Sequence, residues 1–465
     1  MPGSGKTVLA QEYAYTWSHV YKTVLWLNAE SKDTLHADLR DVAQRMGLKP
    51  VQQSQTTTRP PKMEFLLKAF KGLDGGIGYT PSYQETTTAR YDPPSDDLVM
   101  AYVHEKLRKN PGWLLILDNA DDPKPIGDLR EKIYPGTGGH VLITSRNPRW
   151  TGIANAAVAL PDTLDQEQTV AFLKRLCYGD DKVIDAQEQQ AMTSLANEVL
   201  GGLILALNQV ATYVRDTPLM SFAKLRQEGI WRELRTTKSE EYNRKLAVAA
   251  VFRLIMDKVG ERNPDAIKIA HIMAYLAPTE VPADLLWPNS SKALHTLEKL
   301  GVIRRGATAN AFTMHRLQQE AIRGDLAGTY KGLLDKWIRK RDQEQTTLRQ
   351  AFELLGQNWQ YDYNKPSTYA QAGHLAPHLQ ALWQHVLRQR HNDKLAVAML
   401  PMVNSLGGYL LEISSALDEA ITLLEQAVKV GVQKLKSDSV ALAILYNTLG
   451  NSYNKKSKYK KAINY

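Results

Sequence analysis

Short apolar runs alternate with amphipathic stretches over the first 160 residues of the chain. Runs that are apolar on both faces are typical of strands in a parallel sheet that helices cover on both sides. We expect such strands at residues 23–27, 113–117, 140–144 and 157–160. The pattern predicts an α/β domain over residues 1–160.

This pattern is interrupted between about residues 50 and 97, where Gln, Thr, Pro, Gly and Tyr dominate and no core pattern persists. A connection of this length without secondary structure is uncommon inside a compact domain. We interpret the segment as an insertion, a disordered loop or a gene-model error, with a turn or two of helix at residues 63–70.

From residue 162 onward, apolar residues recur at the helical spacing of three and four, as in Val170, Leu173 and Leu176. One segment departs from this pattern: residues 266–303 read as helix, turn and helix, with short strands following at 300–305 and 311–314. That order is typical of a winged helix. The expected domains are therefore a helical domain at residues 161–240, a winged helix at 241–328 and a helical linker at 329–395.

A repeat is visible near the carboxyl end. Small residues flanked by bulky ones indicate paired helices that stack into a solenoid, here close to the tetratricopeptide pattern. We expect partial repeats of this kind at residues 396–465, and a truncated carboxyl end, because a solenoid normally finishes in a polar cap. The positions Gly408, Leu411, Leu417, Ala420 and Ile421 recur as Gly450, Tyr453, Tyr459, Ala462 and Ile463.

Composition narrows the class of protein. With 43% hydrophobic and 23% charged residues, the chain has the balance of a folded protein rather than a disordered one. Its clean apolar runs are far shorter than the ~20 residues that span a bilayer, so we expect no membrane helix. The single cysteine, Cys177, excludes an internal disulfide and a cysteine zinc site, in agreement with a reducing, cytoplasmic compartment.

The net charge of +9 would suit a nucleic-acid partner, but the basic residues are spread along the whole chain. Two basic clusters, at residues 336–341 and 455–461, both read as helical, and such runs are usually solvated faces. We therefore do not expect nucleic acid to be a partner.

The chain begins with a sequence that is typical of a phosphate-binding loop. Gly-Ser-Gly-Lys-Thr precedes an expected helix at residues 8–17, and this arrangement presents backbone N–H groups to phosphate oxygens. Lys6 would bridge the outer phosphates, and the Thr7 hydroxyl would be a ligand of Mg²⁺. The full pattern needs a further glycine before Met1, so we expect a truncated amino terminus; a chance Gly-Lys-Thr at a helix start is the alternative. The residues expected to bind the cofactor here are Gly3, Ser4, Gly5, Lys6, Thr7 and Val8.

A second element follows in the expected order. The apolar run at residues 113–117 ends in Asp118, and such a strand delivers its terminal carboxylate to the magnesium ion beside a phosphate loop. Asn119 occupies the place where hydrolysing proteins often have a second acid, which indicates slow hydrolysis. An ordinary buried strand followed by a polar turn is the alternative.

A third element is the apolar run at residues 141–143, which Thr144, Ser145 and Arg146 follow. An arginine here fits a sensor of the γ-phosphate, because its guanidinium makes planar, charge-assisted hydrogen bonds. The alternative is a solvated arginine after an edge strand. The candidate catalytic residues are Lys6, Asp118 and Arg146, and the candidate metal ligands are Thr7 and Asp118.

Two further segments complete a resemblance to a known family. Residues 201–207, Gly-Gly-Leu-Ile-Leu-Ala-Leu, look like the Gly-Gly-Leu-Pro-Leu-Ala-Leu helix start of NB-ARC proteins. Residues 312–318, Phe-Thr-Met-His-Arg-Leu-Gln, look like the Met-His-Asp or Met-His-Arg-Leu segment that ends their winged helix. With the three motifs above, the chain resembles the NB-ARC type of STAND P-loop NTPases joined to tetratricopeptide repeats.

The resemblance implies roles for individual residues. His315 would contact the β-phosphate of bound ADP and stabilise the closed state, and Ile204 would line the adenine where relatives have proline. Arg316 replaces the aspartate of some members. The family's phosphate loop follows an interior strand of the sheet, so the resemblance also implies that the first strand is missing and that the chain is truncated at both ends.

These observations favour an ATP/ADP-binding signalling switch that binds Mg²⁺ and that changes conformation or forms homo-oligomers when ATP replaces ADP. Its repeats would sense a signal or bind a protein or peptide, and it would at most be a slow P-loop ATPase. One alternative is a non-hydrolysing tetratricopeptide interaction scaffold with a vestigial nucleotide site. A winged-helix DNA-binding regulator ranks last, because residues 291–300 contain only Lys292, His295 and Lys299 as basic residues.

Overall fold

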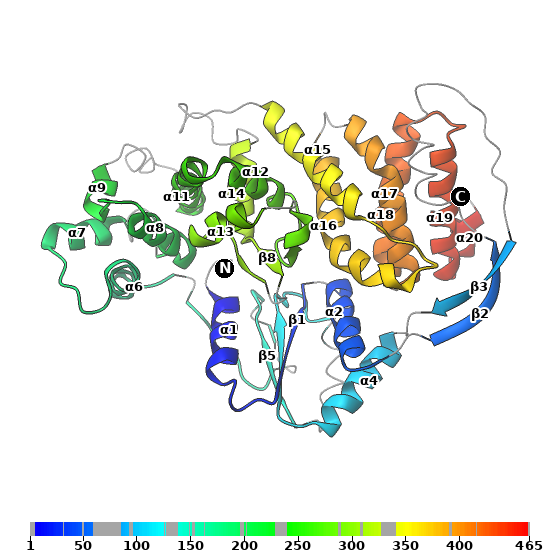
Figure 1. Cartoon of the computed structure of the whole chain (residues 1–465), viewed down its shortest axis with the longest axis horizontal. Helices are drawn as coiled ribbons and strands as arrows, with labels where there is room; N and C mark the ends of the chain where they lie inside the picture. The colour runs from blue at the N-terminus through cyan, green and yellow to red at the C-terminus, as the bar shows by residue number, and fades with distance from the viewer. Residues whose placement is uncertain are drawn as a thin grey trace. The chain divides into compact units, whose positions relative to one another are not determined.

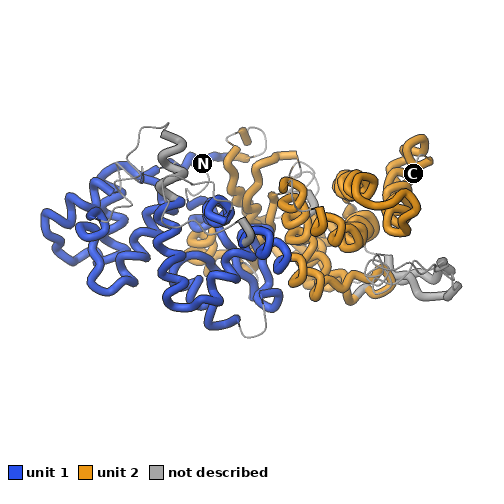
Figure 2. Tube along the Cα trace, turned by 90° about the horizontal axis from the view of Figure 1, so that it is seen from above, with its two compact units in different colours: residues 1–9, 156–351 blue, residues 10–155, 352–465 orange. Residues whose placement is uncertain are grey.

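The chain is rich in helices and contains a small parallel sheet. It forms two compact units, one of residues 1–9 and 156–351 and the other of residues 10–155 and 352–465 (Figure 2). The computed structural model describes residues 5–30, 32–48, 96–124, 126, 138–147, 149–150, 154–161, 163–195, 200, 202–227, 240–286, 290–306, 310–326, 341–389, 393–414 and 416–463, and the backbone alone of residues 51–58 and 85–92.

Three parallel strands form the sheet of the second unit. They are β1 (Thr23–Asn28), β4 (Trp113–Asp118) and β5 (His140–Ile143), in the order β1-β4-β5. Thr23 lies opposite Trp113, and Leu114 lies opposite His140. The expected strands at residues 23–27, 113–117 and 140–144 are confirmed.

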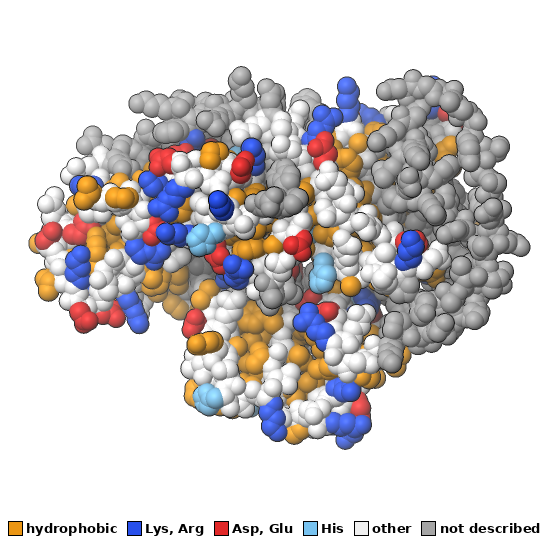
Figure 3. Space-filling view, in the orientation of Figure 1, with side chains coloured by type: hydrophobic (Ala, Val, Ile, Leu, Met, Phe, Trp, Pro, Cys, Tyr) orange, Lys and Arg blue, Asp and Glu red, His pale blue; other side chains and the backbone are white. Residues whose placement is uncertain are grey.

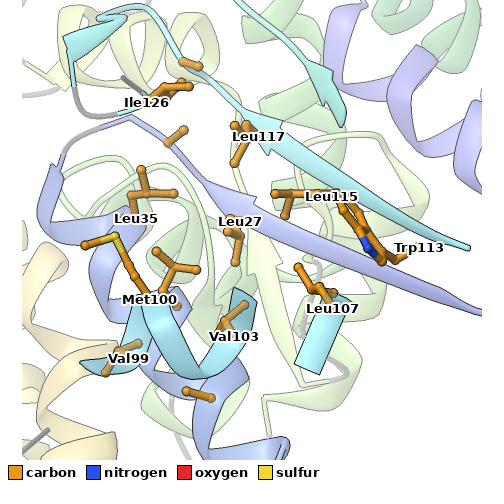
Figure 4. Close-up of a cluster of buried hydrophobic side chains, with 14 of the residues drawn as sticks. Leu27, Leu35, Val99, Met100, Val103, Leu107, Trp113, Leu115, Leu117 and Ile126 are labelled. Atoms are coloured by element: carbon orange, nitrogen blue, oxygen red, sulfur yellow. The ribbon is translucent and has the colours of Figure 1, made fainter. Parts of the chain in front are cut away.

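Helices cover both faces of this sheet (Figure 1). On one face lie α2 (Lys32–Arg45) and α4 (Asp96–Lys109), and Leu115 and Leu117 of β4 are packed among their apolar side chains (Figure 4). The alternate residues of β4, Leu114 and Ile116, face α1 (Lys6–Thr16) on the other side. All six residues of β4 are buried, which explains why this run has no polar position.

The prediction of a fourth strand at residues 157–160 is wrong. These residues are all described and form no strand, and the side chain of Val158 is 85% exposed. A four-residue apolar run becomes a strand only when a neighbouring strand accepts its backbone hydrogen bonds, and the sequence of the run itself does not show whether such a neighbour exists.

The segment between residues 50 and 97 contains two strands that the sequence did not predict. β2 (Val51–Thr58) and β3 (Glu85–Asp92) pair antiparallel, with Val51 opposite Asp92. The interpretation as a disordered loop is therefore wrong for these two stretches, because a hairpin ladder is held by backbone groups and needs no apolar pattern. The expected helical turns at residues 63–70 lie outside the described residues.

In the first unit, a group of helices follows residue 161. They are α6 (Gln166–Tyr178), α7 (Ala186–Ser194), α8 (Ile204–Asp216), α9 (Phe222–Gln227) and α11 (Glu240–Arg262). A capping box begins α6: the Asp165 side chain accepts the backbone N–H of Gln168, and the Gln168 side chain accepts that of Asp165. The buried carboxylate of Glu188 accepts the backbone N–H groups of Phe222 and Ala223, and so caps α9.

The remainder of this unit has the helix, turn, helix and strand order that the sequence indicated. Its three-stranded antiparallel sheet has the order β6-β8-β7, with Arg304 opposite Thr313. The elements are α12 (Pro264–Met273), β6 (Val281–Pro282), η3 (Ala283–Leu285), α13 (Ser291–Lys299), β7 (Arg304–Arg305), β8 (Ala311–Thr313) and α14 (Arg316–Leu326).

Helices also make up the carboxyl part of the second unit, where α17 packs on α18 and α18 on α19. They are η5 (Pro366–Thr368), α16 (Tyr369–Arg388), α17 (Asp393–Glu412), α18 (Leu417–Lys434), α19 (Val440–Lys455) and α20 (Tyr459–Ile463). They follow α15 (Arg341–Asn358), whose residues up to 351 belong to the first unit and whose remainder belongs to the second. The region at residues 396–465, where partial repeats were expected, is therefore made of consecutive helices that pack on one another. The basic cluster at 455–461 is not one helix, because α19 ends at Lys455 and α20 begins at Tyr459.

By length and mean hydropathy, α17 is the one described helix that could cross a membrane. However, 67% of its most apolar window is buried inside the protein. Its apolar character is thus explained by its central place among the carboxyl-terminal helices, where α16 and α18 pack against it.

Candidate functional site

The described part of the expected phosphate loop consists of Gly5 and the start of α1. Gly5 has a φ of +82°, a conformation that glycine adopts without strain, and α1 begins at the next residue. Lys6 and Thr7 are half-buried in the first turn, whereas Val8 is 47% exposed. Gly3 and Ser4 lie outside the described residues. Lys6 and Thr7 are therefore placed where backbone N–H groups of a helix start are available to an anion.

His315 lies in the turn between β8 and α14, and hydrogen bonds hold it in place. Its Nδ1 accepts the backbone N–H of Leu317 at 3.1 Å, and its own backbone N–H donates to Oε1 of Gln318 at 3.1 Å. The side chain of Gln318 in turn donates to the carbonyl of Gly301 at 2.8 Å. Because Nδ1 is an acceptor, the neutral imidazole has its hydrogen on Nε2 and can donate it to a ligand.

The electrostatic surroundings of His315 are positive. Burial lowers the pKa of His315 to about 4, and the charges of Arg304 and Lys6 lower it in the same direction. All three residues belong to the first compact unit. At neutral pH the site thus combines two cations with a neutral hydrogen-bond donor, a set of groups that attracts an anion such as phosphate.

Arg304 is a residue of this site that the sequence analysis did not select. It is half-buried on β7, opposite Thr313 of β8, which precedes His315 by two residues. Only the strand register places it opposite Thr313, and no motif in the sequence indicates that register. Its neighbour Arg305 is exposed, and its Nε donates to Glu298 at 2.9 Å.

Ile204 is the first residue of α8 and is half-buried. Gly202 shapes the chain before it: its φ is +67°, and a Cβ atom there would lie 2.4 Å from the carbonyl oxygen of Leu164. Only glycine fits both conditions, which is a physical reason for a glycine in this motif. Gly201 lies outside the described residues. The contact of Ile204 with adenine remains a prediction.

In the second unit, Asp118 ends β4 and is only 5% exposed. The hydroxyl of Thr144 donates a hydrogen bond to its carboxylate, and the same hydroxyl oxygen accepts the backbone N–H of Asn119 at 3.0 Å. Asn119 has a φ of +61°, so the chain turns sharply after the strand. In the sequence, Thr144 is recognisable only as part of a strand end, and its bond to Asp118 depends on the pairing of β4 with β5.

A Mg²⁺ ion, which a phosphate loop implies, prefers oxygen ligands and usually takes one or two carboxylates in addition to phosphates and water. The carboxylate of Asp118 and the hydroxyl of Thr7 have this chemistry. No group of three His, Cys, Asp or Glu side chains that could hold a metal exists within the described residues. Each of these two groups, taken by itself, has the oxygen chemistry that Mg²⁺ prefers.

Arg146 follows β5 and is 44% exposed. Its Nε donates to Asp121 at 2.6 Å, and its backbone N–H donates to the other carboxylate oxygen at 2.7 Å. Both residues lie just beyond the carboxyl ends of neighbouring strands. To act as a γ-phosphate sensor, as predicted, the Arg146 guanidinium would have to bind the phosphate while it keeps its contact with Asp121, or give up that contact.

Comparisons with known proteins provide a distant likeness. No protein-family model matches the chain, and no curated protein matches it. Among solved structures, it is similar to a signal transduction ATPase with numerous domains (STAND) with a tetratricopeptide repeat sensor from Pyrococcus horikoshii, at 12% sequence identity and a TM-score of 0.38. The match covers 100% of this chain and 72% of that chain. This likeness is too weak to support an argument about function.

Proposed function

We propose that this chain is a nucleotide-binding signalling switch of the STAND kind, which binds ADP and ATP through its first helical turn and His315. The observation that carries the proposal is the positive environment of His315, to which Lys6 of the phosphate-loop sequence and Arg304 both contribute. A neutral imidazole among cations offers hydrogen bonds and charge to a phosphate group.

The other candidate residues have matching chemistry. Thr7 and Asp118 would hold a Mg²⁺ ion, which neutralises phosphate charge when it is bound. Asp118 is oriented for such a role by Thr144. Asn119, unlike a carboxylate, does not accept a proton from an attacking water, so we expect hydrolysis to be slow.

Switching follows if one ligand contacts residues from distant parts of the sequence. A nucleotide that touches both Lys6 and His315 stabilises the arrangement in which these residues are close, and a ligand shifts an equilibrium by its difference in affinity for the two states. We propose that ADP favours this arrangement and that ATP releases it and permits self-association. The helices from α16 to α20 would bind a protein or peptide partner.

Equilibrium dialysis of labelled ADP against the full chain tests the proposal. We expect saturable binding and a loss of affinity of about 10-fold or more in Lys6→Ala, because a charge-assisted phosphate contact contributes about 1.5–3 kcal/mol. Lys268→Ala is a matched control, since Lys268 is 58% exposed and paired with Asp265 in the same compact unit. Absence of saturable binding to the unmodified chain would refute the nucleotide switch.

In that case the interaction scaffold becomes the better interpretation, because the described carboxyl-terminal helices form consecutive packed pairs independently of any nucleotide. A DNA-binding role has less support. On the face shown in Figure 3, Lys and Arg side chains are interspersed with Asp and Glu rather than gathered in one patch. Salt-dependent retardation of duplex DNA would be needed to revive that interpretation.

A further inference from the structure

We propose that Asp121 is a positioning residue, which holds the guanidinium of Arg146 in the orientation in which it binds the terminal phosphate of a nucleoside triphosphate. This inference rests on the proposed function and extends it to the preference of the site for ATP over ADP. The sequence pattern does not single out Asp121, because an acid in the polar turn after a strand is common.

The loops that follow β4 and β5 are joined to each other. These strands are parallel neighbours, so their carboxyl ends lie at the same edge of the sheet. The backbone N–H of Ala120 donates to the carbonyl of Thr144 at 2.9 Å, and the side-chain amide of Asn147 donates to the carbonyl of Asp121 at 3.2 Å. The main chain of Asp121 is therefore held beside Arg146 by bonds that do not involve its carboxylate.

The carboxylate of Asp121 contacts both the main chain and the side chain of Arg146. Its Oδ1 accepts the backbone N–H at 2.7 Å, and its Oδ2 accepts Nε at 2.6 Å and also contacts Nη2. Most ion pairs at a protein surface contribute little, because two long side chains must be fixed in one geometry. Here the bond to the backbone N–H already fixes the carboxylate, so Asp121 sets the direction of the guanidinium.

This contact leaves a second edge of the guanidinium for a ligand. One edge is formed by Nε and Nη2, which both face Asp121, and the other is formed by Nη1 and Nη2. Nη1 has no hydrogen-bond partner among the described residues, and the side chain of Arg146 is 44% exposed. Two oxygens of a terminal phosphate fit this second edge, so Arg146 can bind the phosphate while it keeps its contact with Asp121.

Equilibrium dialysis of labelled ATP and ADP against Asp121→Asn in the full chain tests the assignment. The amide has one acceptor oxygen and no charge, so it does not accept both the backbone N–H and the guanidinium of Arg146. We expect the affinity for ATP to fall about 3- to 10-fold and the affinity for ADP, which lacks the γ-phosphate, to stay within about 2-fold. Higher ATP affinity would show that Asp121 competes with the phosphate, and unchanged ATP affinity that it has no role; either result overturns the assignment.

Asp122→Asn is the matched control at the adjacent, exposed position. The Oδ1 of Asp122 accepts the backbone N–H of Lys124 at 3.0 Å, and an amide oxygen accepts the same bond. This variant should bind both nucleotides as the unmodified chain does. An equal loss of ATP affinity in Asp121→Asn and Asp122→Asn would show a general effect of charge on the loop and would overturn the assignment.

A double-mutant cycle separates an effect through Arg146 from a general effect on the loop. In Arg146→Gln, the ratio of ATP to ADP affinity should already be reduced. The addition of Asp121→Asn should change this ratio by less than about 2-fold, because a positioning residue has no effect once the group it positions is absent. A second reduction as large as that of Asp121→Asn alone would show that Asp121 acts without Arg146.

A further readout needs no substitution and therefore does not depend on the folding of a variant. In NMR of the unmodified chain, the Nε–H of Arg146 should exchange with solvent several-fold more slowly than that of the exposed Arg149, both without nucleotide and with ATP bound. Equal rates, or faster exchange of Arg146 when ATP binds, would contradict a retained contact with Asp121. Failure of the proposed function is distinct, since the unmodified chain would then bind neither ATP nor ADP.

Discussion

The hydroxyl of Thr144 donates a hydrogen bond to the buried carboxylate of Asp118, and thereby joins the ends of two neighbouring strands. Thr144→Val keeps the shape of the side chain but leaves that carboxylate without this donor and the backbone N–H of Asn119 without its acceptor. We expect the free energy of unfolding to fall by about 2–4 kcal/mol. Urea denaturation followed by circular dichroism would measure it.

Thr144→Ser is the control for this substitution, because it keeps the hydroxyl and removes only a methyl group. We expect it to cost about 1 kcal/mol or less. If the valine and serine variants were equally stable, the hydrogen bond to Asp118 would contribute nothing, and the orientation of Asp118 would have another origin.

Two glycines with positive φ differ in their surroundings and so allow a matched comparison. Gly202→Ala places a Cβ atom 2.4 Å from the Leu164 carbonyl oxygen, whereas Gly179→Ala meets nothing within 4 Å. We expect Gly179→Ala to cost about 1–3 kcal/mol from backbone strain alone. Gly202→Ala should cost about 2 kcal/mol more than that, because steric overlap is added to the strain. Thermal unfolding of both variants measures the difference; equal costs would mean that the segment before α8 is not held against Leu164.

Asp96 joins α4 directly to α2, and through Arg40 it is linked to the turn after α17. It contacts His36 and Arg40, and Arg40 also donates to the Ser414 carbonyl at 2.6 Å. Burial raises the pKa of Asp96, but the hydrogen bond from His36 and the charge of Arg40 outweigh it and hold the pKa below its usual range. The ionised carboxylate therefore stabilises the fold above about pH 4, and this contribution is lost as the pH falls through the folded-state pKa.

Asp96→Asn should therefore destabilise the chain by about 2 kcal/mol at pH 7 and by less at pH 3. Asp97→Asn, at the exposed neighbouring position of the same helical turn, is the control and should cost about 1 kcal/mol or less, as is usual for an exposed carboxylate. Chemical denaturation at the two pH values gives the comparison. A loss that does not depend on pH would show that the charge of Asp96 is unimportant.

The lowered pKa of His315 predicts a second pH dependence of the stability of the fold, at higher pH than that of Asp96. Its pKa is about 4 in the folded chain and near 6.5 when unfolded, so the unfolded state binds the proton first as the pH falls. Stability should therefore decrease between pH 6.5 and pH 4, by at most about 3 kcal/mol, and then level off. His315→Gln, which is neutral throughout, should lack this decrease in denaturation experiments. His295→Gln, on the exposed face of α13, should retain it.

Several elements were predictable because their information is local. The run at residues 113–117 contains only apolar residues, and such a run with an acid at its end indicates a buried strand. The start of α1 followed equally from Gly5 and from the helix-like sequence beyond it. The strand expected at residues 157–160 was wrong for the converse reason, since the same apolar character does not create a pairing neighbour.

The sequence by itself determined which residue types stand at the ends of strands and helices: Lys6 in the first turn of α1, Asp118 after the apolar run and His315 after β8. Only the tertiary structure decided that Arg304 lies opposite Thr313 and that Arg40 reaches the carbonyl of Ser414. These partners depend on strand register and on the packing of helices that are distant in the chain. A local pattern encodes burial and secondary structure, whereas the choice of a long-range partner depends on the competition among all surfaces that fold together.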